Sequence, residues 1–135
     1  MPTVLIETRM ARSAEAETAL MDAVHAALVQ AFQIPPNDRE VRLIAHAPHR
    51  FQAPPDRALP ECFTLISIDA FAGRSTEAKR ALYRAIVDRL EPLGIPPDHV
   101  LTVLREHPRE NWGVRGGRAA SRHHCHEYAG RPDRR

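Results

Sequence analysis

The chain has 135 residues, of which 43% are hydrophobic, and a formal net charge of +2. This length suits one domain with a substantial core, the small net charge gives no reason to expect a nucleic acid partner, and no apolar run could span a membrane. The two cysteines form no disulfide framework and the N-terminus lacks a signal-peptide pattern, so we expect a cytoplasmic protein.

The first half of the chain predicts a strand, a helix and a second strand. TVLIET, residues 3–8, is the first strand, and Pro2 is tolerated at its start because proline has no backbone N–H to give to a sheet. A helix is predicted from about Ser13 to Phe32, where apolar residues recur at helical spacing, and two following prolines end it. VRLIAHA, residues 41–47, is the second strand.

The second half predicts the same three elements after a linker. Residues 48–61 are rich in proline and have neither helical nor strand periodicity, which is typical of a linker. CFTLISIDAF, residues 62–71, predicts a strand, a helix runs from about Ser75 to Leu93, and HVLTVLRE predicts the last strand.

These two halves repeat each other at a nearly constant spacing. Each contains Ile-Pro-Pro, an Asp, an apolar strand and a final His-x-Pro or His-Pro, and Arg12 and Arg74 each precede a serine at a helix start. We interpret residues 2–47 and 62–106 as two copies of one βαβ unit. Because the crossover helix implies parallel pairing, the predicted fold is α/β: two tandem repeats forming one four-stranded mixed sheet with two helices on one face. The other face would be bare in a monomer, which predicts oligomerisation.

Residues 121–135 are expected to lie outside this domain, which spans residues 1–120, as a flexible basic tail. The stretch RHHCHEY contains three histidines and a cysteine, but adjacent ligands on one short peptide cannot easily surround a tetrahedral ion. We therefore predict no metal site.

A doubled βαβ unit that begins at Pro2 resembles the tautomerase superfamily, most specifically in AGRSTEAKRALYRAIVDRL and REHPRENWGVRGG. The long-chain branch, which includes malonate semialdehyde decarboxylase and cis-3-chloroacrylic acid dehalogenase, is the most similar. The resemblance implies a cofactor-independent homotrimer acting on a small enol or 2-keto carboxylic acid. It also implies that removal of Met1 exposes Pro2 as a secondary amine that serves as general acid and base.

The resemblance implies a set of site residues as well: Pro2, Asp38 and His25 as catalytic, and Arg74, Arg42 and Trp112 as substrate-binding. The role of Pro2 as a base is chemically reasonable, because an α-amine has a pKa of about 8. Burial beside arginine cations lowers this pKa towards the working range of a general base. An arginine at a helix start can also bind a carboxylate with its bidentate fork.

Structural alternatives remain for these residues. Asp38 also fits a simple turn residue, His25 a partly buried helix residue, and Trp112 a core or oligomer contact. At the level of function, the alternatives are a catalytically silent binding or signalling protein with this scaffold, and a decarboxylase or hydratase similar to malonate semialdehyde decarboxylase.

Overall fold

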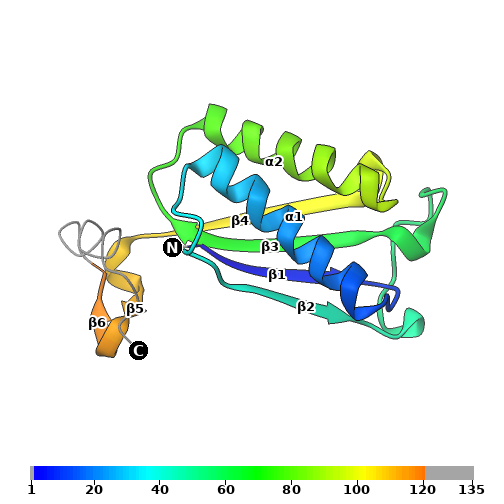
Figure 1. Cartoon of the computed structure of the whole chain (residues 1–135), viewed down its shortest axis with the longest axis horizontal. Coiled ribbons are helices and arrows are strands. Elements are labelled where there is room, and N and C mark those ends of the chain that lie inside the picture. The colour runs from blue at the N-terminus through cyan, green and yellow to red at the C-terminus, as the bar shows by residue number, and fades with distance from the viewer. Residues whose placement is uncertain (1, 121–135) are drawn as a thin grey trace.

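The computed structural model describes residues 2–120, in which two helices cover one face of a four-stranded sheet (Figure 1). Met1, whose removal is predicted, and residues 121–135, predicted to be a tail, lie outside the described residues. The strands run in the order β2-β1-β3-β4. Their bounds are β1 Thr3–Thr8, β2 Val41–Ala45, β3 Thr64–Phe71 and β4 Val100–His107.

The pairing confirms the predicted mixed sheet. Within each repeat the two strands are parallel, β1 with β2 and β3 with β4, and the repeats join through the antiparallel pair β1 and β3. Helix α1, Ala14–Phe32, connects the first pair, and helix α2, Thr76–Leu90, connects the second. Two βαβ units thus form one sheet.

Both helices begin at the serines that the sequence indicates. The Ser13 side chain accepts a hydrogen bond from the Ala16 N–H at 3.2 Å, and Ser75 accepts one from the Ala78 N–H at 3.1 Å. Such N-caps satisfy N–H groups that the first helical turn leaves without partners. The two copies of the repeat therefore use the same local signal.

Several element ends differ from the sequence prediction. Helix α2 stops at Leu90 instead of Leu93 and continues as a 3₁₀ turn, because Pro92 has no N–H to donate to the preceding helical turn. Strand β2 ends at residue 45 instead of 47, since its partner β1 ends at Thr8. Strand β3 begins at Thr64, because residues 60–62 form a 3₁₀ turn.

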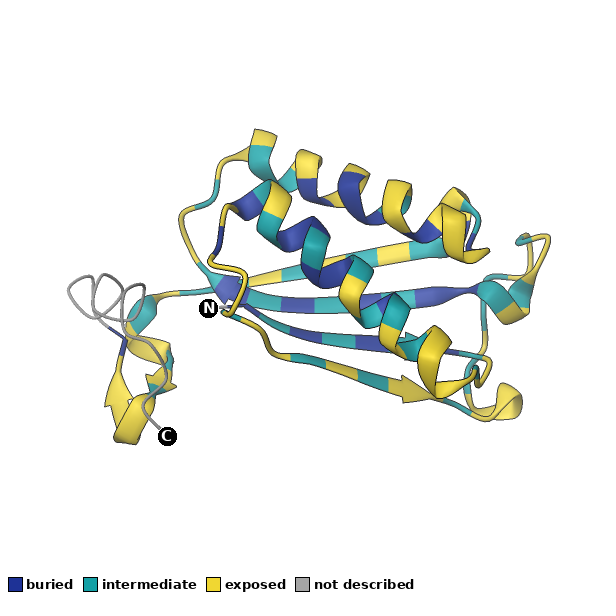
Figure 2. Cartoon of the chain, in the orientation of Figure 1, coloured by how far each residue is buried: buried dark blue, intermediate teal, exposed yellow. Residues whose placement is uncertain are grey.

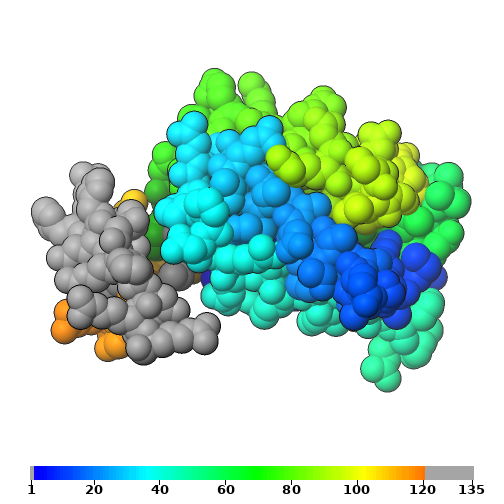
Figure 3. Space-filling model, viewed as in Figure 1, coloured from blue at the N-terminus to red at the C-terminus, as the bar shows by residue number. Residues whose placement is uncertain are grey.

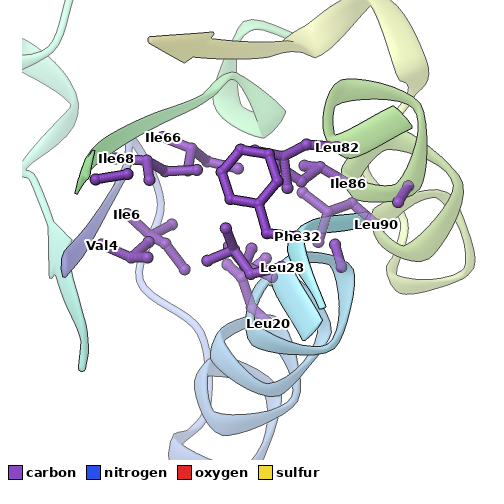
Figure 4. Packing of buried hydrophobic residues seen from close by; sticks show 14 of the residues in the cluster. Val4, Ile6, Leu20, Leu28, Phe32, Ile66, Ile68, Leu82, Ile86 and Leu90 are labelled. Atoms are coloured by element: carbon purple, nitrogen blue, oxygen red, sulfur yellow. The ribbon is translucent and has the colours of Figure 1, made fainter. Parts of the chain in front are cut away.

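The core lies between the helices and the sheet. Alternate strand residues, including Val4, Ile6, Ile66 and Ile68, are fully buried. Figure 2 shows this alternation of buried and partly exposed positions along the central strands. The buried strand residues pack against side chains from both helices (Figure 4). From α1 these are Leu20, Leu28 and Phe32, and from α2 they are Leu82, Ile86 and Leu90. Figure 3 shows the two helices covering the sheet from this side.

The opposite sheet face, here called the open face, carries exposed apolar side chains. Ile44 is 45% exposed, Leu101 50% and Val103 38%. Since strand residues alternate between faces, all three point away from the helices. The bare face that the sequence predicts is therefore present, and it carries exposed apolar side chains.

A short hairpin follows β4 and projects beyond the end of the sheet (Figure 1). It consists of β5, Gly113–Val114, and β6, Arg118–Ala119, joined through Gly116 and Gly117 at φ 71° and 75°. These left-handed values favour glycine. No helix within residues 2–120 has the length and apolarity needed to cross a membrane.

Candidate functional site

The predicted catalytic proline lies where β1 begins and β3 and β4 end. Thr3 pairs with Asp69 in the antiparallel register, so continuing it by one residue places Pro2 opposite Ala70, which itself pairs with Glu106. Pro2 is buried, and strand alternation directs it to the helix side. Two strand spacings, on the order of 10 Å, separate it from Glu106.

Arg74 lies at this same end, directly before the N-cap Ser75. Its Nη1 donates a hydrogen bond to the Phe32 carbonyl at 2.9 Å, and its Cζ lies 4.7 Å from the centre of the Phe32 ring. Partial burial lowers the pKa of Arg74 and the positive charge of Arg109 lowers it further, whereas Glu106 opposes the shift. The group stays cationic, because arginine is not deprotonated in proteins. Among residues 2–120, the hydrogen bond to the Phe32 carbonyl is the one found for its guanidinium.

Glu106 fixes the turn that carries Arg74. Its Oε2 accepts the Gly73 N–H at 3.1 Å, and its Oε1 pairs with Lys79. The hydrogen bond from Lys79 lowers the pKa of Glu106, against a smaller opposing effect of desolvation. Gly73 has φ 120°, a conformation that L side chains rarely adopt. The carboxylate thus holds a glycine turn next to the predicted carboxylate-binding arginine.

Trp112 forms an aromatic wall at the same end of the sheet. Its ring meets Phe71 edge-on at 5.2 Å between centroids and His107 at 5.9 Å. The indole Nε1 is buried and has no hydrogen-bond partner within residues 2–120. Arg109 lies with its Cζ 4.6 Å from the centre of the Phe71 ring. Trp112 therefore lies at the end of the sheet where Pro2 and Arg74 lie, but it packs against Phe71 and His107, whose side chains belong to the open face.

Asp38 and His25 meet through one loop. His25 is buried in α1 with its Nε2 2.8 Å from the Pro36 carbonyl, an acceptor, so the hydrogen is on Nε2. The Asp38 N–H donates to the Pro35 carbonyl at 2.9 Å. This turn leads into β2, whose start lies beside the start of the parallel strand β1. Asp38 therefore lies at the Pro2 end, while His25 holds the loop that carries it.

Arg42 lies apart from the other predicted site residues. It pairs with Leu5 in the register of β1 and β2, on the open face, and its exposed side chain contacts Glu40 with Nη1 3.1 Å from Oε1. Arg74 lies on the helix side. Within one chain, these two arginines are not brought together.

Two acid–histidine pairs on the open face are absent from the sequence prediction. Asp69 Oδ1 lies 2.8 Å from His107 Nε2, and Glu7 Oε1 lies 3.0 Å from His46 Nε2. Each pair joins the first strand of a repeat to the end of its second strand. The sequence holds a signal for them, because the acids are 62 residues apart and the histidines 61, the spacing of the repeat itself.

Within residues 2–120 no group of three or more His, Cys, Asp or Glu side chains is arranged to hold a metal ion. The histidine-rich stretch at residues 122–128 lies outside the described part of the chain.

Comparison with known proteins connects this geometry to a family. Residues 38–115 match the family model described as Tautomerase enzyme. The FG41 malonate semialdehyde decarboxylase inhibited by 3-bromopropiolate is 30% identical, with a TM-score of 0.79 over 96% of this chain and 99% of that chain. A second malonate semialdehyde decarboxylase, described as having decarboxylase and hydratase activities, is 29% identical, with a TM-score of 0.78 over 86% and 92% of the two chains.

A fused 4-OT described as a symmetric trimer is also similar, at 29% identity and a TM-score of 0.67 over 87% of this chain and 95% of that chain. The match to the family model extends over more than half of the chain, and the fold agrees with these structures throughout the two repeats. The chain therefore belongs to the tautomerase family.

Proposed function

We propose that this chain is a cofactor-independent tautomerase that uses Pro2, freed by removal of Met1, as general acid and base on a small enol or 2-keto carboxylic acid. One observation carries the proposal: Pro2 is buried at the end of the sheet where the partly buried Arg74 and the aromatic wall of Trp112 also lie. This arrangement provides a base, a carboxylate-binding group and an apolar surface.

The reaction needs only one proton to move. The neutral secondary amine of Pro2 accepts the proton of the enol hydroxyl and returns it to the carbon at the far end of the double bond. The C=C–OH unit becomes CH–C=O, with no redox change and no leaving group. The rigid pyrrolidine ring fixes the direction of the nitrogen lone pair, which favours transfer between the enol oxygen and the carbon two bonds away.

Arg74 serves both binding and reactivity in this proposal. Its guanidinium forms two parallel hydrogen bonds to the substrate carboxylate. Its positive charge, together with burial of Pro2, disfavours the protonated amine and so lowers the pKa of the base. Asp38, in the turn beside the start of β1, is proposed to orient a water molecule or the Pro2 amine, and His25 holds that turn in place.

We also propose that the active protein is a homotrimer. The exposed apolar side chains of the open face support self-association, and a fused 4-OT at 29% identity is described as a symmetric trimer. In such an assembly Arg42, on the open face, would approach a neighbouring copy instead of its own Arg74. The cytoplasmic location expected from the sequence stays a prediction.

A second candidate function is that of a decarboxylase or hydratase similar to malonate semialdehyde decarboxylase. Similarity to two malonate semialdehyde decarboxylases, at 30% and 29% identity, favours it. Asp38 lies at the Pro2 end, where its carboxylate could direct a water molecule. A silent binding protein is the third candidate, and it requires no free Pro2 amine.

The test compares wild type and Pro2→Ala on an aryl enolpyruvate and on malonate semialdehyde. We expect Pro2→Ala to lose about 10²- to 10⁴-fold in kcat/KM on the enol, the usual contribution of a positioned proton-transfer group, with an unchanged circular dichroism spectrum. Faster turnover of malonate semialdehyde than of the enol would instead identify a decarboxylase. Intact-mass analysis comes first, because retained Met1 or full activity of Pro2→Ala would contradict the proposed mechanism.

A further inference from the structure

The turn that leads from β3 to Arg74 is held to the end of β4 by two adjacent hydrogen bonds. The Ala72 N–H donates to the main-chain carbonyl of His107 at 3.0 Å. The Gly73 N–H donates to Oε2 of the Glu106 side chain at 3.1 Å. The second bond therefore depends on which side chain the sequence provides at the end of β4, whereas the first does not.

Glu106 lies on the same side of the sheet as Arg74. It pairs with the buried Ala70 in the register of β3 and β4, on the face that the helices cover. Its second oxygen, Oε1, forms an ion pair with Lys79 of α2. The hydrogen bond from Lys79 lowers the pKa of Glu106 most, and the main-chain N–H groups of Gly73 and Arg74 lower it as well. One ionised carboxylate thus joins β4, the glycine turn and the start of α2.

The main chain on both sides of Arg74 is fixed by specific contacts. Before it, Gly73 has φ 120°, a conformation that L side chains rarely adopt. After it, Ser75 caps the first turn of α2. The guanidinium itself is bound to the Phe32 carbonyl at 2.9 Å. A shift of the glycine turn would therefore move the guanidinium of Arg74 relative to Pro2.

The charge of Glu106, taken alone, acts against the binding of an anion. Burial lowers the pKa of Arg74, and the carboxylate of Glu106 opposes this shift, because it attracts the guanidinium. The same carboxylate would repel that of a substrate. If charge decided its effect, removal of Glu106 would strengthen the binding of a carboxylate. If the hydrogen bond from Gly73 decides it, removal of Glu106 weakens that binding. The two roles predict opposite signs.

We propose that Glu106 is a positioning residue of this site: it holds the Gly73 N–H, and thereby the main chain of Arg74, where the guanidinium can bind a substrate carboxylate. Glu106 does not contact the substrate. The inference rests on the proposed role of Arg74 and deepens it, since it names the residue that sets the affinity of Arg74 for carboxylates. The ion pair with Lys79 contributes to stability and leaves the bond from Gly73 in place.

The test is an NMR titration of isotope-labelled protein with pyruvate, combined with hydrogen exchange of the amide at position 73. Glu106→Ala removes the acceptor and the charge, Glu106→Gln keeps one acceptor oxygen, and Lys79→Gln removes only the ion pair. Gly73→Ala strains the same turn through its backbone alone, because an added Cβ would meet no atom within 4 Å.

Glu77→Ala is the matched control. Glu77 is exposed in the first turn of α2, so its replacement removes the same charge close to Arg74 without touching the glycine turn. Circular dichroism of each variant verifies folding.

We expect Glu106→Ala to weaken pyruvate binding about fivefold or more, the effect of a lost hydrogen bond to a charged group, and to speed exchange of the Gly73 amide. Gly73→Ala should weaken binding similarly, although every charge remains. Glu106→Gln should recover part of the affinity, and Lys79→Gln should change it by less than about threefold. Glu77→Ala should not weaken binding. In turnover of the enol, Glu106→Ala should raise KM more than it lowers kcat.

Other outcomes would overturn the inference. Pyruvate affinity that is unchanged or higher in Glu106→Ala leaves Glu106 with a charge effect only, and an equal loss in Glu77→Ala excludes a specific role. Weaker binding without faster exchange at Gly73 excludes the turn as the cause. Wild-type protein that does not bind pyruvate removes the role of Arg74 and the inference with it. Failure of the proton-transfer mechanism is distinguishable, because it would show as full activity of Pro2→Ala on the enol.

Discussion

Arg74 donates a hydrogen bond from Nη1 to the main-chain carbonyl of Phe32, 2.9 Å away, and thereby joins the start of α2 to the end of α1. Phe32 is the last residue of α1, where carbonyls lack intrahelical partners and a positive charge interacts favourably with the helix dipole. Contacts between the two helices therefore hold Arg74, the residue predicted to bind the substrate carboxylate, on the helix side of the sheet. One arginine contributes both to stability and to the site.

Replacing Arg74 should separate these two contributions. Arg74→Ala should lower the free energy of unfolding by about 1 kcal/mol, for one hydrogen bond and one charge at a helix end, and should raise KM. It should also raise the pKa of the Pro2 amine by removing a nearby cation, so the rise of kcat/KM with pH should move to higher pH. Arg74→Lys should restore more of the pH profile than of KM. Urea unfolding and pH–rate profiles test this, and an unchanged KM and profile in Arg74→Ala would contradict it.

His25 offers a test of how the Asp38 turn is held. His25→Ala removes the hydrogen bond to the Pro36 carbonyl, which water can replace because Pro36 is exposed, and should cost about 0.5–1.5 kcal/mol of stability. Because that turn carries Asp38, kcat/KM should also fall, and His25→Gln, whose amide can donate to the same carbonyl, should recover part of both losses. The matched control is His49→Ala, at an exposed position. If His25→Ala were as stable as that control, the hydrogen bond would contribute nothing.

Most of the fold could be predicted because its signals are local and duplicated. Ser13 and Ser75 cap the helices as their spacing indicates, and the alternation along β1 and β3 separates the buried side from the open face. The wrong end of β2 depends on a partner distant in sequence. Strand β2 stops where β1 stops, which no property of residues 46 and 47 themselves would reveal.

The site could be predicted only in part. Pro2, Asp38, Arg74 and Trp112 were suggested by resemblance, and the strand directions bring them to one end of the sheet. Glu106 was missed, because its closeness to the turn before Arg74 follows from the parallel register of β3 and β4 and not from any motif. The acid–histidine pairs carried a usable signal in the repeat spacing, since Glu7 and Asp69 occupy equivalent positions.

The open face should decide the oligomeric state. Val103 is 38% exposed there, and Tyr83 is 37% exposed on α2, on the helix side. If the trimer buries the open face, Val103→Asp introduces a charge without a partner into the interface and should convert the trimer to monomers in sedimentation velocity experiments. Tyr83→Asp is the matched control and should remain trimeric. A trimer that survives Val103→Asp but not Tyr83→Asp would place the interface on the helices.

The lowered pKa of Glu106 predicts how the stability of the protein should depend on pH. The hydrogen bond from Lys79, aided by the Gly73 N–H, lowers the pKa of this carboxyl below its ordinary value of 4.5. A carboxyl with a lowered pKa stabilises the fold fully above its unfolded-state value, and the contribution is lost as pH falls through the folded-state value. Lys79 stays charged throughout this range, so the change comes from Glu106.

Between about pH 5.5 and pH 7, Glu106→Gln should therefore be less stable than wild type by about 0.5–1 kcal/mol. The value is modest because the ion pair between Glu106 and Lys79 is partly exposed to solvent. At about pH 3 the difference should shrink, because the wild-type carboxyl is then approaching its own neutral form. Urea unfolding at these pH values measures the difference, with Glu61→Gln, at an exposed position without a resolved pKa shift, as the control. A difference that grows as the pH falls would have the wrong sign for a carboxylate held by Lys79 and Gly73, and the turn before Arg74 would then be fixed by other contacts.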